Sequence, residues 1–314
     1  MPIETSQNDQ VERLQASNET ERSIGHITLA PGERLLTNLQ AEHRLIQQLL
    51  GGGLHSYATE DLRAILRALK GGIPFPVIQV AGFPTRLFRG FNCEDVESVP
   101  ADVRAYSYCP KEIAVECGRC HPPKSSMFYG ALDLSTMLSE VCAGSTRYVR
   151  YGVARWKEGA RQNDFVTVGQ LDQMRRFRTT AFGPSQLDSI VQNVLDQTPA
   201  EQRARCLLID AFFGDLFSRD ARRVRDYRST YFLSEMMLTL ATGERRDGIF
   251  YPSVAHRGGL NLAIVPESFD ECFEWERFEV LEIIEPFAYN LFLQRTVAKS
   301  KSISGGKIEW EILG

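Results

Sequence analysis

Short apolar and β-branched runs, grouped along the chain rather than separated by regular helices, are the feature that most constrains the fold. Because strict alternation of strand and helix is missing, the pattern predicts a mixed α+β fold rather than a doubly wound parallel sheet. Helices are expected at 133–143, at about 185–218 with a break, and at 229–241. Strands are expected at 76–81, 86–89, 127–132, 147–155, 164–168, 249–254, 260–265, 278–284, 288–298 and 307–313.

The segment that precedes these strands divides into two parts. Residues 1–25 are polar, acidic and almost free of large apolar side chains, which predicts a disordered arm. Residues 26–75 predict a helical extension, and residues 76–314 hold the expected strands and form the main domain. The extension is either a small docking unit or a pair of helices that pack on the main domain.

Two helices are expected in this extension. The first covers 33–50, and the glycines that follow at 51–53 stop it. The second begins with Thr59 as its N-cap, carries acidic residues in its first turn, and ends before Gly71.

Composition argues against several classes of protein. The net charge of −4 disfavours direct nucleic-acid binding, because neutralising phosphates needs a surplus of basic residues. No apolar run approaches the ~20 residues that span a bilayer, so no membrane partner is expected. The 7 cysteines are odd in number and irregularly spaced, which favours reduced thiols. Residues 1–6 lack a basic start and an apolar stretch, so we expect a cytoplasmic location.

Five polar residues lie in short strings along the main domain. Arg89 lies in Arg-Leu-Phe-Arg-Gly and Arg119 in Gly-Arg-Cys-His-Pro-Pro. Tyr129 follows ten residues after Arg119, and Glu140 eleven residues after that. Ser253 lies far downstream in Gly-Ile-Phe-Tyr-Pro-Ser-Val. Together these strings supply cations, an aromatic ring, a carboxylate and a hydroxyl.

The strings resemble the RES domain, a family named for its Arg, Glu and Ser residues. The resemblance spans about residues 85 to 270 and departs from the family pattern at Cys120-His121, where an aromatic residue and Asn are usual. It rests on residues 86–90, 118–123, 127–133 with Glu140, 247–254 and 258–263.

This resemblance implies an ADP-ribosyltransferase-like fold of mixed or antiparallel sheets with flanking helices. Such domains are typically toxins of bacterial toxin–antitoxin pairs that destroy NAD by hydrolysis or phosphorolysis, and a few transfer ADP-ribose to a protein. The resemblance therefore implies NAD as a substrate in a cleft between sheets, no tightly bound cofactor or metal, and a cognate antitoxin as partner. A binding or regulatory module without turnover remains the non-enzymatic alternative, and homo-oligomer formation is left open.

Glu140 is the candidate for the central chemical role. Nicotinamide leaves NAD without protonation, so the barrier is the oxocarbenium-like ribose cation that remains. A fixed carboxylate beside that sugar stabilises the developing charge. Glu140 lies about two turns into a helix that Asp133 is expected to cap, which would hold the carboxylate rigidly. The alternative is an ordinary exposed glutamate on a helix.

The other site residues receive their roles from the resemblance. Arg119 and Arg89 would hold the pyrophosphate or order the site, with Arg89 expected at the end of a strand. Tyr129 would position nicotinamide, and Ser253 would orient the substrate. Structural ion pairs and a core tyrosine are the alternatives. Asn261 is expected to hold a turn.

Two further patterns allow other interpretations. Cys109, Cys117, Cys120 and His121 have a loose spacing that could suit zinc, although reduced thiols are favoured. Haem attachment at Cys-Gly-Arg-Cys-His is disfavoured, because two prolines follow where an axial-ligand helix would continue. The arginines at 222–228 form either a solvated face or a surface for an acidic partner.

Overall fold

The structure, a computed structural model, describes residues 36–142, 146–183, 186–219, 227–240, 242–287 and 289–313. The expected arm at 1–25 and the arginines at 222, 223 and 225 lie outside these ranges. The described helices are α2 (Leu36–Gly52), α3 (Thr59–Lys70), α4 (Leu134–Val141), α5 (Gln170–Phe177), α6 (Gln186–Gln197), α7 (Ala200–Ser218), α8 (Arg228–Leu238) and α9 (Pro266–Cys272). Two short 3₁₀ helices are η1 (Leu54–Ser56) and η2 (Val103–Tyr106).

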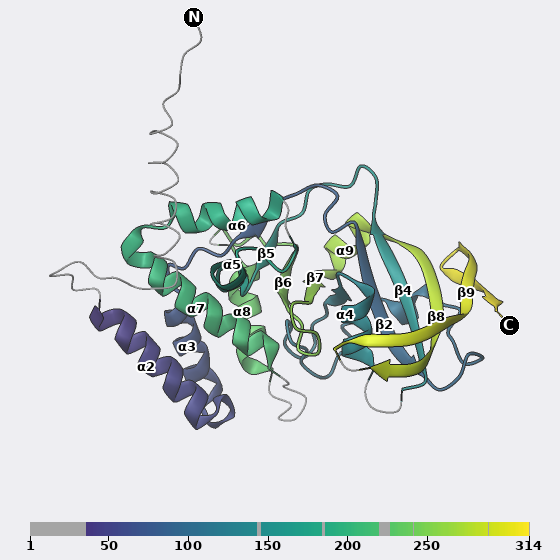
Figure 1. The fold of residues 1–314 in the computed structure, drawn as a ribbon, viewed down its shortest axis with the longest axis horizontal. Coiled ribbons are helices and arrows are strands. Elements are labelled where there is room, and N and C mark those ends of the chain that lie inside the picture. The colour runs from purple at the N-terminus through teal and green to yellow at the C-terminus, as the bar shows by residue number, and fades with distance from the viewer. Residues whose placement is uncertain are drawn as a thin grey trace, which may run out of the picture.

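The described strands form one ten-stranded sheet with the order β1-β5-β6-β7-β3-β2-β4-β8-β9-β10. Only β5 and β6 pair in parallel, and all other neighbours are antiparallel. The strands are β1 (Val77–Ile78), β2 (Arg86–Cys93), β3 (Phe128–Ala131), β4 (Tyr148–Trp156), β5 (Phe165–Thr167), β6 (Gly248–Pro252), β7 (Leu260–Ile264), β8 (Phe273–Phe287), β9 (Leu291–Ser304) and β10 (Lys307–Ile312). In Figure 1, α2, α3 and α5 to α8 gather at one end of the molecule, and β8 and β9 lie at the other. The predicted α+β class is confirmed.

The sheet has a narrow junction where the site lies. Strands β2 and β3 pair through one register position, Phe88 opposite Ala131. The junction divides the sheet into the half β1-β5-β6-β7-β3 and the half β2-β4-β8-β9-β10. The expected cleft between separate sheets is therefore corrected to an opening within one sheet, because this short pairing joins the two halves.

The helical extension packs on the main domain, as the second of the two interpretations expects for α2 and α3. Leu49 of α2 and Leu62, Leu66 and Leu69 of α3 are fully or almost fully buried in one apolar cluster with residues of α7, α8 and β6. The spacing of the α3 leucines puts them on one face of the helix. Arg205 of α7 reinforces the contact through an ion pair with Glu42 and hydrogen bonds to carbonyl groups at the end of α3.

Some expected boundaries are wrong for local reasons. Helix α2 continues through Gly51 and Gly52, and the chain leaves the helix at Gly53, whose φ is 77°. Thr59 is the first residue of α3 rather than its cap, since the N-cap is Ala58, which makes no side-chain cap bond. Helices α5 and α9 were not expected.

Helix α5 is held at its start by a residue of α7. The buried Asp210 carboxylate accepts hydrogen bonds from the backbone N–H groups of Gly169 (2.8 Å) and Asp172 (3.0 Å). Gly169 has a φ of 79°, and a Cβ there would lie 3.3 Å from the Pro252 ring and from the Gly214 backbone. Only glycine combines this conformation with such a close approach. Asp210 thus ties α7 to the start of α5, and Gly169 packs against Pro252 at the end of β6, next to Ser253.

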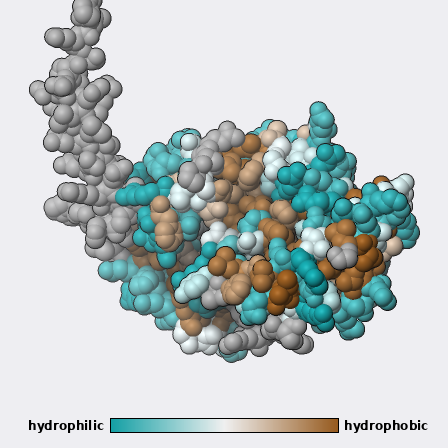
Figure 2. All heavy atoms as spheres, turned by 45° about the vertical axis from the view of Figure 1, so that its right-hand side comes forward, coloured by the Kyte–Doolittle hydropathy of each residue, from teal (hydrophilic) through white to brown (hydrophobic). Residues whose placement is uncertain are grey.

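The surface shows mixed character. On the face drawn in Figure 2, patches of apolar side chains interrupt a largely hydrophilic surface. Within the described ranges, no helix is both long and apolar enough to cross a membrane.

We predict that Asp210 makes stability depend on pH. Burial raises its pKa from 3.8 to about 7, although the backbone donors oppose this rise. The folded chain therefore binds one more proton than the unfolded chain between these values. Its contribution to stability is complete below pH 3.8 and is lost as pH rises through about 7, at about 1.4 kcal/mol per pH unit inside this window.

Urea unfolding of the wild type and of Asp210→Asn at a series of pH values between 5 and 8 measures this effect. As pH rises, the unfolding free energy of the wild type should fall relative to that of Asp210→Asn. A difference that is constant across the series would show that Asp210 does not titrate there.

Candidate active site

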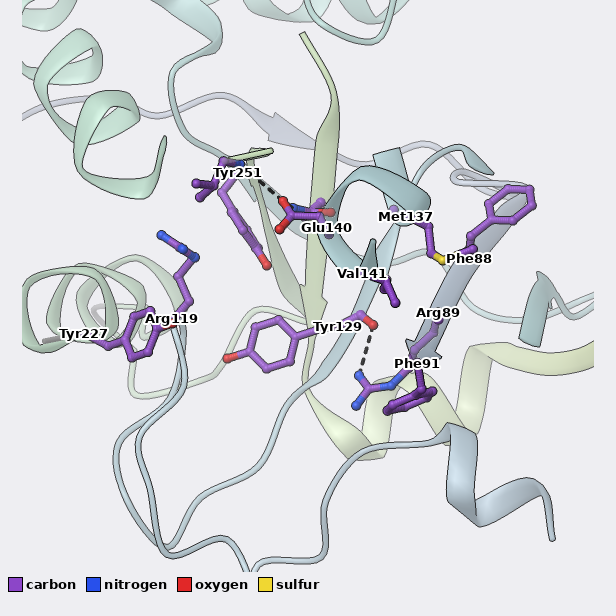
Figure 3. A pocket seen from close by; sticks show the side chains of 15 residues that line it. Phe88, Arg89, Phe91, Arg119, Tyr129, Met137, Glu140, Val141, Tyr227 and Tyr251 are labelled. Atoms are coloured by element: carbon purple, nitrogen blue, oxygen red, sulfur yellow. Dashed lines mark hydrogen bonds between the residues drawn. The ribbon is translucent and has the colours of Figure 1, made fainter. Parts of the chain in front are cut away.

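A cavity of about 370 Å³ opens at the junction between β2 and β3. Helix α4 lies along one side of it, and the ends of β6 and β7 form another wall (Figure 3). The lining residues are Phe88, Arg89, Gly90, Phe91, Arg119, Tyr129, Gly130, Ala131, Met137, Glu140, Val141, Tyr227, Tyr251, Val254 and Asn261. Of the five predicted site residues, Arg89, Arg119, Tyr129 and Glu140 line this cavity.

Helix α4 places Glu140 at the cavity as expected. The Asp133 side chain caps the helix, because its Oδ1 accepts from the Thr136 N–H at 2.8 Å. Thr136 Oγ1 donates to the same carboxylate at 2.7 Å and lies 2.7 Å from His256 Nδ1. The loop between β6 and β7 is thereby tied to the start of α4, so the helix and the loop hold a fixed relation.

The Glu140 carboxylate is held through one of its two oxygens. Oε1 accepts hydrogen bonds from Ser253 Oγ (2.6 Å), Asn261 Nδ2 (2.9 Å) and the Val254 N–H (3.2 Å). Among the described residues, no hydrogen bond is made to Oε2. Three donors thus fix the orientation of the carboxylate, while the second oxygen is left for a ligand.

Two of these donors differ from the sequence-based expectations. Ser253 is buried and directs its hydroxyl to Glu140, where it also accepts from the His256 N–H at 3.0 Å. Its hydroxyl proton is engaged by the carboxylate rather than free for a substrate. Asn261 lies in β7, opposite Tyr251 of β6, so the expectation that it holds a turn is wrong. This register places the side-chain amide of Asn261 within hydrogen-bonding distance of Glu140.

Arg89 occupies the opening between β2 and β3. It lies in the middle of β2, not at a strand end as expected, and Nη1 donates to the Tyr129 carbonyl at 3.0 Å. Its guanidinium also lies 5.2 Å from the ring centres of Phe91 and Phe128. Its Nε is buried without a hydrogen-bond partner among the described residues. Burial lowers the pKa of Arg89 to about 10, so it stays cationic at neutral pH.

Arg119 reaches the cavity from the loop before β3. Its Nη1 donates to the carbonyls of Phe217 (2.7 Å) and Arg219 (3.2 Å) at the C-terminal end of α7. The partial negative charge at a helix C-terminus suits this cation. The guanidinium also lies 5.4 Å from the ring centre of Tyr227, at the start of α8.

Two phenols lie between these groups, the half-buried Tyr129 and the buried Tyr251. The Tyr129 hydroxyl accepts from the Cys120 N–H at 2.9 Å, which fixes its ring in the cavity wall. Burial raises the pKa of both Tyr129 and Tyr251 well above 10, so both are neutral hydrogen-bonding groups at physiological pH. In Figure 3, Tyr251 lies beside Glu140 and points into the cavity.

The cysteine and histidine cluster provides no metal centre. Within the described ranges, no group of three or more His, Cys, Asp or Glu residues could hold a metal ion. Burial raises the pKa of Cys120 to about 12 and lowers the pKa of His121. Cys120 is therefore a neutral thiol, and the zinc interpretation has no ligand set to support it.

The cavity thus combines a fixed carboxylate with two arginines and several aromatic rings. Sequence reasoning missed Tyr227 and Tyr251 and gave Asn261 a different role. Tyr251 and Asn261 stand next to recognised residues in the strings around Ser253 and could have been found there. No comparable sequence signal marked Tyr227.

The comparison with protein families identifies the domain in which most of this cavity lies. The model of the RES domain matches residues 99–287, more than half of the chain. The match starts after β2 and so does not include Arg89. No curated protein and no solved structure matches this chain. At the family level, the RES domain indicates an NAD-related, toxin-like function. On this match, the chain belongs to the RES-domain family.

Proposed function

We propose that this protein cleaves the bond between nicotinamide and ribose in NAD and passes ADP-ribose to water or phosphate. The observation that carries the proposal is the Glu140 carboxylate, which three donors hold at Oε1 and to which no described residue donates at Oε2. A carboxylate fixed in this way can face a ribose that gains positive charge. NAD is the substrate in this account, and no other cofactor takes part.

Each of the five predicted site residues has a role that its position allows. Glu140 stabilises the ribosyl cation as the C1′–N bond breaks and both bonding electrons leave with nicotinamide. Arg119 and Arg89 neutralise the pyrophosphate or order the site. Tyr129 borders the reacting sugar and nicotinamide. Ser253 acts through Glu140 as a positioning residue, which replaces the direct contact with substrate that the sequence suggested.

The acceptor then attacks C1′ of the cation. Water gives ADP-ribose after loss of a proton, phosphate gives ADP-ribose 1″-phosphate, and a protein side chain gives an ADP-ribosylated protein. Glu140 has the same role in all three reactions, so its geometry does not select the acceptor. Incubation with labelled NAD, with and without phosphate, separates them by product, because only transfer labels protein bands.

The biological setting extends the family-level function. A cognate antitoxin that covers the NAD cleft would keep the enzyme inactive in the producing cell. This partner follows from the toxin-like character of the family and is part of the proposal. A co-purified protein that suppresses nicotinamide release would support it.

Glu140→Gln should lower kcat for nicotinamide release by about 100-fold or more, because a neutral amide cannot offset a cationic transition state. The amide oxygen can still accept from Ser253 and Asn261, so folding should be preserved. Chromatography of nicotinamide released from NAD measures the effect. Glu158→Gln, at an exposed residue outside the cavity, is the matched control and should retain full turnover.

Activity in Glu140→Gln equal to that of the control would remove Glu140 from the mechanism. Absence of nicotinamide release from the wild type, with or without phosphate, would favour a binding module over an enzyme.

Ser253→Ala should lower kcat by about tenfold to hundredfold and change KM little. It removes one charge-assisted hydrogen bond of about 1.5–3 kcal/mol that orients Glu140 and makes no bond of its own to the substrate. Steady-state kinetics with NAD separate the two constants. An unchanged kcat with a raised KM would instead assign Ser253 to substrate binding.

A further inference from the structure

Tyr227 has no part in the chemistry described above, although its ring lines the cavity. It is the N-cap residue of α8, and its carbonyl accepts from the Tyr231 N–H at 3.0 Å. The side chain is partly buried against the apolar cluster beneath α7 and α8. The ring is therefore held in place while part of it remains available at the cavity wall.

The cavity residues form an ordered series across the site. In Figure 3, Met137 and Val141 lie on one side of Glu140, and Tyr251, Arg119 and Tyr227 lie on the other. Tyr251 lies between Glu140 and Arg119 in this view. Arg119 in turn lies over Tyr227, with 5.4 Å from its guanidinium carbon to the ring centre.

This order restricts how a dinucleotide can lie. Nicotinamide is bonded directly to the reacting ribose. If the Glu140 carboxylate faces that ribose, nicotinamide must bind close to the carboxylate as well. Met137 and Val141 are three residues before and one residue after Glu140 on α4, and both offer apolar surface in the cavity wall. The pyrophosphate and the adenosine of NAD then extend past Tyr251 toward the positive charge of Arg119.

Beyond Arg119 the series ends with an aromatic ring. An adenine nucleotide presents its groups in the same order, with phosphates followed by a ribose and a flat base. Aromatic rings bind bases through their π-faces, and an arginine guanidinium stacks on bases as well. Tyr227 and Arg119 together thus offer the groups that bind a nucleobase next to a phosphate.

We propose that Tyr227 binds the adenine base of NAD and that Arg119 bridges this base to the pyrophosphate. The proposal rests on the proposed function for the identity of the substrate. It adds that the enzyme recognises the purine end of a dinucleotide, at a residue outside the strings that resemble the family.

Calorimetric titration of the full-length protein with ADP and with inorganic pyrophosphate tests this assignment. ADP has the phosphates and the base without nicotinamide, so its binding is measured apart from catalysis. The wild type should bind ADP at least about tenfold more tightly than pyrophosphate, equivalent to about 1.4 kcal/mol. This comparison needs no variant.

Two substitutions then locate the base. Tyr227→Leu should weaken ADP binding about tenfold and leave pyrophosphate binding unchanged, whereas Tyr227→Phe should keep the wild-type affinity for both. Circular dichroism melting of each variant checks that it folds with the stability of the wild type. Equal ADP affinity in all three proteins, or no preference of the wild type for ADP over pyrophosphate, would overturn the proposal.

Nicotinamide release from NAD by the same wild-type preparation separates this proposal from the proposed function. Release without any dependence of ADP binding on Tyr227 would refute the adenine site and leave NAD cleavage intact. The predicted ADP affinities without nicotinamide release would support a nucleotide site and refute the cleavage reaction.

Discussion

The hydrogen bonds to Oε1 of Glu140 are the interaction on which the site depends. The acid comes from α4, whereas its donors come from β7 and from the loop between β6 and β7. A second link, from Asp133 and Thr136 to His256, joins the start of α4 to the same loop. The carboxylate is thus fixed by two elements that are themselves tied together, which gives it the preorganisation that the proposed electrostatic catalysis needs.

The opening in the sheet gives this carboxylate access to a ligand. If β2 and β3 paired along their whole lengths, a backbone N–H of β2 could donate to the Tyr129 carbonyl. The Arg89 side chain would then lose this carbonyl as its acceptor. Instead the strands meet at Phe88 and Ala131, and the Arg89 side chain bonds to the carbonyl. The sheet therefore stays continuous while a buried cation and a cavity occupy the space between its halves.

Local signals explain what could be predicted from the sequence. Asp133 followed by a helical pattern indicated both the start of α4 and the position of Glu140, because capping involves neighbouring residues. Asn261 and Ser253 reach Glu140 through the strand register and through contact with α4. Both lie more than 100 residues from Glu140 in the sequence, so no local pattern indicates these contacts. Helix α5 depends on Asp210 of another helix, so its own sequence gives little sign of it. Helix α9 had a local signal in Pro266 at its first turn that the strand pattern obscured.

The most direct measurement of the central claim is the structure of the protein bound to carba-NAD, in which a carbocycle replaces the nicotinamide ribose and prevents cleavage. The account predicts that Oε2 of Glu140 lies within hydrogen-bonding distance of the 2′-hydroxyl on that ring, with Oε1 still held by Ser253 and Asn261. A bound analogue whose nicotinamide-bearing ring lies away from Glu140 would contradict it.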